Sequence, residues 1–95
     1  MHVQIVNFRL KDGVDRDIFL AENRNVEENF IFKMPGIVSR ETAQSEDGEW
    51  LVCLHWESPE DAQNSMDKFV DAQETKDFTA LIDMDTFTMR RYATP

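Results

Sequence analysis

The chain has 95 residues, of which 41% are hydrophobic and 31% are charged, a composition that excludes disordered and fibrous proteins. Nineteen acidic residues against ten basic ones give a formal net charge of -9, which disfavours nucleic acid and anionic lipid as partners. Because no apolar run is long enough to cross a bilayer and the N-terminus lacks the features of a signal peptide, we expect one cytoplasmic domain over residues 1–95.

Residues 1–36 are predicted to form a strand followed by a helix. β-Branched and aromatic residues dominate His2–Leu10, which favours the strand. The helix begins with a cap at Asp15 or a neighbour, runs to about Lys33 and ends at Pro35-Gly36. Its buried face is expected to hold Phe19, Val26, Phe30 and Met34. Its solvated face is expected to hold Glu22, Asn23, Arg24, Glu27 and Glu28.

Residues 37–56 are predicted to form a hairpin of two unlike strands. Polar and apolar side chains alternate from Ile37 to Gln44, which is typical of an edge strand. Asp47-Gly48 supplies the positive backbone angle that a tight turn needs. The run from Trp50 to Trp56 is apolar on both faces, which favours a central strand.

The last third of the chain is predicted to form a helix in two pieces and a final strand. Ser58 and Pro59 mark a helix start, with a capping hydroxyl followed by proline at the first helical position. The first piece is expected to bury Ala62, Met66, Phe69 and Val70. A second piece extends from about Thr75 to Ile82, and residues 86–92 alternate as the last strand.

This order of elements predicts a ferredoxin-like α+β fold, βαββαβ, with its second helix split in two. Its four-stranded antiparallel sheet has the order 4-1-3-2, with the helices on one face. Strands one and three carry large apolar residues at both parities, so the uncovered face is a hydrophobic patch. We expect a second copy of the chain to cover it, giving a homodimer with an eight-stranded barrel; the alternative is a monomer with a functional groove there.

Three segments carry a resemblance to a known family. They are Met34-Pro35-Gly36-Ile37, Asp47-Gly48-Glu49-Trp50 and Trp56-Glu57-Ser58-Pro59-Glu60-Asp61-Ala62. Through them, and over His2–Tyr92, the chain resembles the antibiotic-biosynthesis-monooxygenase-like (ABM-like) proteins of the dimeric α+β barrel superfamily. The resemblance implies a dimeric barrel and activities that range from cofactor-independent oxygenation of aromatic polyketides to haem degradation.

The site residues of those relatives match this chain unequally. A strand-one asparagine of the haem-degrading relatives matches Asn7, but residues 58–71 contain no tryptophan and residues 72–82 contain no histidine to hold iron. The polyketide oxygenases use asparagine, tryptophan and arginine, which Asn7, Trp56 and one of Arg9, Arg40 or Arg91 match here. The resemblance therefore implies a cofactor-independent monooxygenase for an aromatic or quinone-type molecule. The alternative is a non-catalytic protein that binds a small apolar ligand or has a stress-related role.

Asn7, Arg9 and His55 are the candidate catalytic residues. Such an oxygenase must deprotonate a phenol and stabilise its anion, and an amide, a guanidinium and an imidazole suit these tasks. All three residues have odd numbers on the two central strands, so they share one surface if odd positions point the same way. The structural alternative is that Asn7 and His55 are hydrogen-bonded residues of the core or the dimer interface.

Trp56, Met66, Phe69 and Phe78 are candidates for lining a substrate pocket between helices and sheet, and otherwise are core residues. Cys53 is expected to be an inert core thiol, because no base accompanies it. Two distant histidines and one cysteine give no metal-ligand spacing, so we expect neither metal nor cofactor.

Overall fold

The structure is a computed structural model that describes residues 1–95. Its strands form one antiparallel sheet in the order β2-β3-β1-β4. The strands are β1 (His2–Leu10), β2 (Ile37–Gln44), β3 (Trp50–Trp56) and β4 (Ile82–Ala93). Read from the other edge, this is the order 4-1-3-2, so the predicted ferredoxin-like sheet is confirmed.

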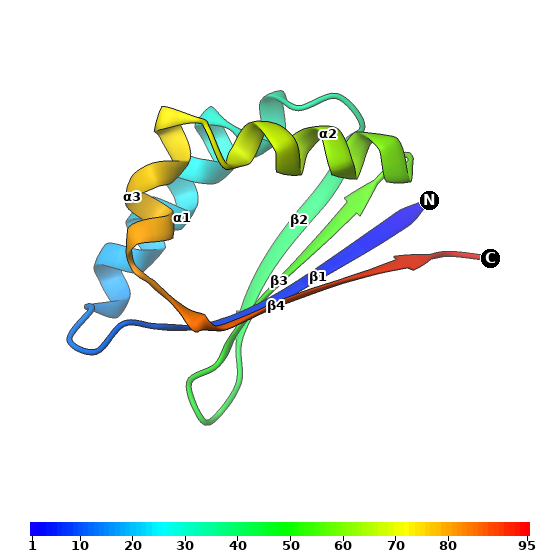
Figure 1. Ribbon diagram of the computed structural model, residues 1–95. Coiled ribbons are helices and arrows are strands. Elements are labelled where there is room, and N and C mark those ends of the chain that lie inside the picture. The colour runs from blue at the N-terminus through cyan, green and yellow to red at the C-terminus, as the bar shows by residue number, and fades with distance from the viewer.

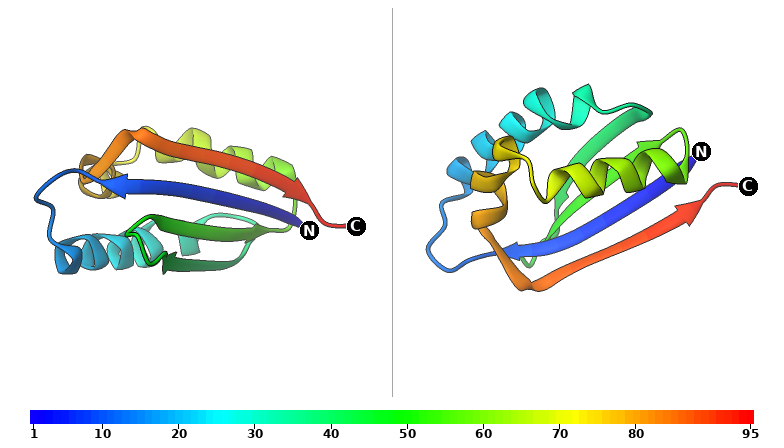
Figure 2. Two further views of the ribbon diagram at one scale, coloured as in Figure 1. Left: turned by 90° about the horizontal axis from the view of Figure 1, so that it is seen from below. Right: turned by 45° about the horizontal axis from the view of Figure 1, so that its top comes forward.

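All helices lie on one side of the sheet and leave the other side bare (Figure 1), as two further views also show (Figure 2). The α-helices are α1 (Arg16–Asn29), α2 (Pro59–Phe69) and α3 (Lys76–Ala80), and the short 3-10 helices are η1 (Ile31–Lys33) and η2 (Gln73–Thr75). No helix has both the length and the apolar character needed to span a membrane. We call the two sides of the sheet the covered face and the open face.

Side-chain caps begin the two longer helices as predicted. The Asp15 carboxylate accepts the N–H of Asp17 at 2.7 Å at the start of α1. The Ser58 hydroxyl accepts the N–H of Asp61 at 3.1 Å, and Pro59 is the first residue of α2. Each cap satisfies a backbone donor that the helix itself leaves free.

A glycine is required where the chain enters β2. Gly36 has a φ of +81°, and a Cβ at this position would collide with the side chain of Asp61. Its carbonyl accepts the N–H of Glu57 at 2.8 Å. Pro35-Gly36 therefore brings the start of β2 directly against the beginning of α2.

The core lies between the helices and the covered face. From His2 to Phe8 in β1 and throughout β3, the even-numbered side chains are buried there, while the odd-numbered ones are only partly buried. Phe8 of β1, Phe19 of α1 and Phe78 of α3 have ring centroids 5.6–6.1 Å apart, so one aromatic cluster joins three elements.

Three local predictions are wrong. The last strand begins at Ile82 and not at Thr86, because Ile82 and Asp83 continue the pairing with Leu10 and Arg9 beyond an irregularity in β1 and β4. Asn23 is buried rather than solvated, since its amide donates to the Thr42 hydroxyl at 3.2 Å. Val70 is 68% exposed, because α2 has already ended at Phe69.

The open face carries an apolar centre. Val3 and Ile5 of β1 lie beside Leu51 and Cys53 of β3, and all four side chains are partly exposed. Cys53 therefore belongs to this face, and the prediction that it is a core thiol is wrong. Burial, followed by the nearby Glu41 carboxylate, raises the pKa of its thiol, so it is a weak nucleophile at neutral pH.

Candidate functional site: a cavity between helices and sheet

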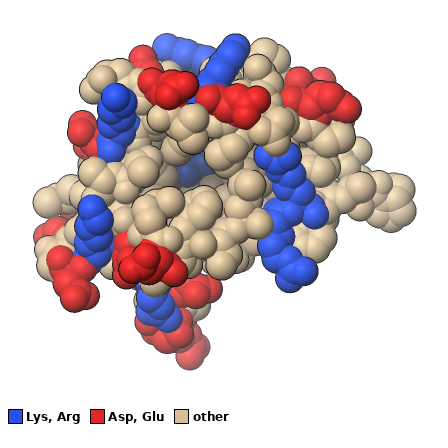
Figure 3. All heavy atoms as spheres, viewed as in Figure 1, with Lys and Arg blue, Asp and Glu red and all other residues tan.

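A cavity of about 510 Å³ lies between the covered face and the helices. Fourteen of its twenty lining residues are hydrophobic, and they come from all four strands, α2, α3 and the segments around them. Its mouth is the hollow visible in Figure 3, where blue atoms of a basic residue show at the floor. The cavity has the size and apolar character of small-molecule sites.

Aromatic and thioether side chains form much of the cavity wall. The four residues predicted to line a pocket all border it: Trp56, Met66, Phe69 and Phe78. Phe69 and Phe78 meet edge to face, with ring centroids 6.4 Å apart. Flat rings beside a flexible methionine suit an aromatic occupant.

Trp56 is held in one orientation by a buried polar chain. Its indole N–H donates to Gln4 Oε1 at 3.0 Å, and Gln4 Nε2 donates to Met89 Sδ at 2.9 Å. Trp56 is fully buried and Gln4 is 4% exposed. The amide therefore satisfies the indole at the cavity wall and fixes the ring plane.

Arg40 of β2 places a positive charge at the cavity. Its side chain is 3% exposed, and its Nη1 donates to Glu27 Oε1 at 2.9 Å and to the Thr42 hydroxyl at 3.4 Å. Burial lowers the pKa of the guanidinium, and the hydrogen bond and charge of Glu27 oppose that effect. An arginine stays protonated in a protein, so Arg40 is a cation in a mainly apolar cavity.

The remaining polar groups of the lining are few. Arg40 and the exposed Lys76 are its only ionisable side chains, and no aspartate, glutamate, histidine, tyrosine or cysteine borders the cavity. Gln4, Ser65, Thr75 and Thr79 complete the polar lining. The cavity thus offers cationic and neutral groups to a ligand, but no carboxylate or imidazole to accept a proton.

The three predicted catalytic residues lie elsewhere. Asn7, Arg9 and His55 do share one surface, but that surface is the open face, and none of them borders the cavity. The His55 ring contacts the Ser39 hydroxyl at 3.1 Å on the neighbouring strand. The sheet separates these residues from the cavity, and their catalytic role stays a prediction.

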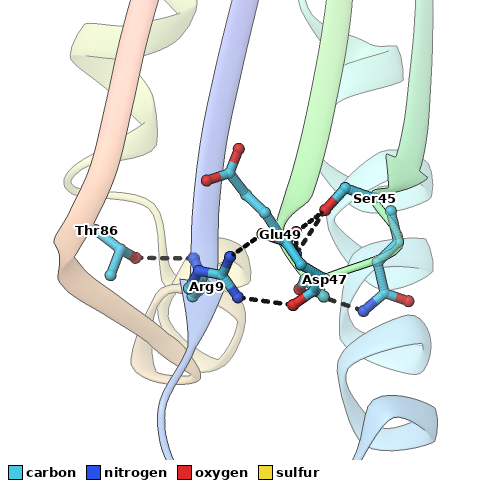
Figure 4. A network of polar contacts seen from close by, with 7 residues as sticks. Arg9, Ser45, Asp47, Glu49 and Thr86 are labelled. Atoms are coloured by element: carbon cyan, nitrogen blue, oxygen red, sulfur yellow. Dashed lines mark hydrogen bonds and ion pairs between the residues drawn. The ribbon is translucent and has the colours of Figure 1, made fainter.

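Arg9 has a local structural partner at the β2–β3 turn (Figure 4). Its Nη2 and the Asp47 carboxylate are 2.8 Å apart, and its backbone N–H donates to the Thr86 hydroxyl at 2.8 Å. The Ser45 hydroxyl, the N–H of Glu49 and Arg9 lower the pKa of Asp47. The guanidinium thereby ties β1 to the turn.

Gln4 is a cavity residue that the sequence analysis did not foresee, and Arg40 was named there only as one of three arginines that could match the site of the relatives. Both interrupt an apolar or alternating strand with a polar side chain on the helix-facing parity. The sequence did not show which parity of each strand faces the helices, and this information was needed to place the two residues. Nowhere do three or more histidine, cysteine, aspartate or glutamate side chains cluster as they would around a metal ion.

No protein-family model and no curated protein matches this sequence. Solved structures do match its fold, among them a putative antibiotic biosynthesis monooxygenase from Bordetella bronchiseptica, with a TM-score of 0.80, 12% identity and coverage of 99% of this chain and 96% of that one. SnoaB, a cofactor-independent oxygenase from Streptomyces nogalater, matches with a TM-score of 0.75 and 15% sequence identity. The match covers 99% of this chain and 93% of SnoaB.

A putative antibiotic biosynthesis monooxygenase from Chloroflexus aurantiacus gives a TM-score of 0.70 at 20% identity, with coverage of 99% of this chain and 92% of that one. At such identities the likeness concerns the fold, since one fold hosts many chemistries. The resemblance is confirmed at that level: this chain shares the ferredoxin-like α+β fold of these structures.

Proposed function

We propose that this protein binds an aromatic or quinone-type small molecule in the cavity between helices and sheet and oxygenates it without a cofactor. The single observation that carries the proposal is the cavity itself, at about 510 Å³ and with fourteen hydrophobic residues among the twenty that line it. SnoaB, which has the same fold, is described as a cofactor-independent oxygenase, and this supports the chemical class.

The reaction requires a substrate that supplies the electrons. An aromatic ketone with an activated methylene loses a proton to give an enolate, which reacts with O₂ at carbon. One oxygen atom becomes a new carbonyl, and the other leaves as water with the two hydrogens from the methylene. The cationic guanidinium of Arg40 lies where it would stabilise the enolate, and the apolar wall limits access of water.

One observation favours a second candidate, a non-catalytic binding protein for an apolar ligand. The cavity lining has no carboxylate or imidazole, so the proton of the substrate would have to leave to water. A binding protein needs no such acceptor. A stress-related role for such a binding protein stays within this second candidate.

We also propose that the protein works as a cytoplasmic homodimer through the open face. The partly exposed Val3, Ile5, Leu51 and Cys53 form a continuous apolar centre on adjacent strands, which a second sheet would bury. Asn7, Arg9 and His55 would then lie at or near the interface. If they act in catalysis, their site would be one that two subunits build together.

Oxygen consumption tests the proposal and locates the chemistry. With anthrone as substrate, the wild-type protein should consume O₂ faster than buffer alone, and Arg40→Met should abolish most of this excess. Asn7→Ala and His55→Ala should retain it if the cavity is the site. If these two variants lose activity and Arg40→Met keeps it, the reaction takes place at the open face and not in the cavity. Binding of anthrone without O₂ consumption would support the binding protein instead.

A further inference from the structure

Arg40 has a hydrogen-bonding edge that the protein does not use. Both of its side-chain hydrogen bonds start from Nη1, so the three N–H groups on Nε and Nη2 have no acceptor in the chain. Only two fully buried side-chain polar atoms lack a hydrogen-bond partner, His2 Nε2 and Arg91 Nε. The nitrogens of Arg40 are not among them. Nε and Nη2 of Arg40 therefore keep some accessible surface, and Arg40 borders the cavity.

That edge has a defined recognition geometry. Nε–H and one Nη2–H of a guanidinium point in parallel and match two neighbouring oxygens, as in a carboxylate. The 3% exposure of the side chain means that an anion there would meet an almost desolvated cation. In such surroundings a charge-assisted pair is stronger than on the surface.

Glu27 and Thr42 hold the guanidinium in place from the other edge. Glu27 Oε1 is 2.9 Å from Nη1, and its side chain is 24% exposed, so it offsets part of the positive charge. Thr42 is in turn held by Asn23 of α1 at 3.2 Å. Arg40 is thus a preorganised donor whose charge is only partly compensated.

We propose that the Nε and Nη2 edge of Arg40 recognises an anionic pair of adjacent oxygens, so that the ligand is an aromatic molecule carrying an ionised acidic group. This inference rests on the proposed function, because it names the chemical class of the molecule in the same cavity. Two sources supply the oxygen pair: a carboxylate, or the ionised hydroxyl and neighbouring carbonyl of a hydroxyquinone. Glu27 weakens the attraction and sets how strongly an anion is preferred.

Matched anionic and neutral probes test it by isothermal titration calorimetry at neutral pH. The carboxylate arm compares 2-naphthoate with 2-naphthamide, and the hydroxyquinone arm compares 2-hydroxy-1,4-naphthoquinone with its 2-methoxy analogue. Wild type should prefer the anionic member of at least one pair, and Arg40→Met should weaken that anion by roughly 10- to 100-fold while the neutral probe changes little. Glu27→Gln should bind the same anion about 3-fold more tightly. Arg24→Met, which removes an exposed arginine of α1, should match wild type.

The outcomes separate this inference from the proposed function. If anionic and neutral probes bind wild type equally well, the cavity binds aromatic molecules but Arg40 does not favour anionic ones. In that case only this inference fails. If no probe binds, the cavity is not a ligand site and the proposed function fails as well. Because Arg40→Met leaves Glu27 without its partner, the double variant Arg40→Met/Glu27→Gln, which has no unpaired charge, serves as the check if the single variant unfolds. It should show the same loss of anion preference.

Discussion

The two faces of β1 lie in different environments. Phe8 is 1% exposed beneath the helices, whereas Ile5 has the opposite parity and lies partly exposed on the open face, which no helix covers. On the covered face the chain completes its own packing and encloses a cavity. On the open face it leaves apolar surface that only another molecule can bury. Similar side chains on one strand should therefore differ in what their loss affects: the stability of the fold in one case, assembly in the other.

The largest expected effect comes from a truncation on the covered face. Phe8→Ala removes a ring that packs against Phe19 and Phe78, and it should lower the free energy of unfolding by about 3–5 kcal/mol. Urea denaturation followed by circular dichroism measures this. Ile5→Ala is the matched variant and should cost clearly less at low protein concentration, where assembly does not contribute. Equal losses would contradict the division between the two faces.

A charge on the open face should break assembly without unfolding the chain. We expect wild type to sediment at twice the chain mass of 11.1 kDa, and Ile5→Asp to sediment as a single chain, because a buried carboxylate would have no partner there. Sedimentation equilibrium at micromolar concentration makes the comparison, and an unchanged far-ultraviolet spectrum shows that the fold is kept. A wild-type protein that sediments at 11.1 kDa would overturn the homodimer proposal.

The buried polar chain at the cavity wall should have a measurable coupling. Trp56→Phe removes the N–H that donates to Gln4, and a cycle with Gln4→Leu isolates that bond from the loss of packing. We expect a coupling free energy of about 1 kcal/mol, since both partners are buried. Additive effects in thermal unfolding would mean that Gln4 does not orient the indole.

The smallest effect concerns the exposed turn. The lowered pKa of Asp47 means that its carboxylate stabilises the folded chain above the ordinary value of 3.8, and that this contribution is lost as pH falls through the lowered pKa. Asp47→Asn should therefore be slightly less stable than wild type at about pH 6, and the difference should shrink towards about pH 3. Denaturation midpoints at the two pH values test this. A gap that widens on acidification would contradict the assignment.

The sequence predicted the strands well because their signals are local. Alternation in β2, the apolar run of β3 and the Asp47-Gly48 turn depend on neighbouring residues only, and the bounds of β1, β2 and β3 agree with the structure. Capping by Asp15 and Ser58 is equally local. The sheet order followed from the short list of topologies open to such an element order.

The site was harder to predict because β1 and β3 are apolar at both parities. Nothing in the residues of either strand says which parity meets the helices, so Asn7 and His55 were candidates for the same site as Trp56 and Phe78. The structure places the two pairs on opposite faces. Burial of Asn23 also escaped prediction, since it depends on a contact with Thr42, which lies on another element.

The two tryptophans lie in separate surroundings. Trp56 borders the cavity, whereas Trp50 does not. The ring centroids of Trp50 and Phe19 are 4.6 Å apart, and Arg16 Cζ lies 5.6 Å from the Trp50 ring centroid. In a Trp50→Phe background the remaining indole is an intrinsic fluorophore at the ligand wall. Entry of a molecule into the cavity would then be visible as a change in emission without any attached label.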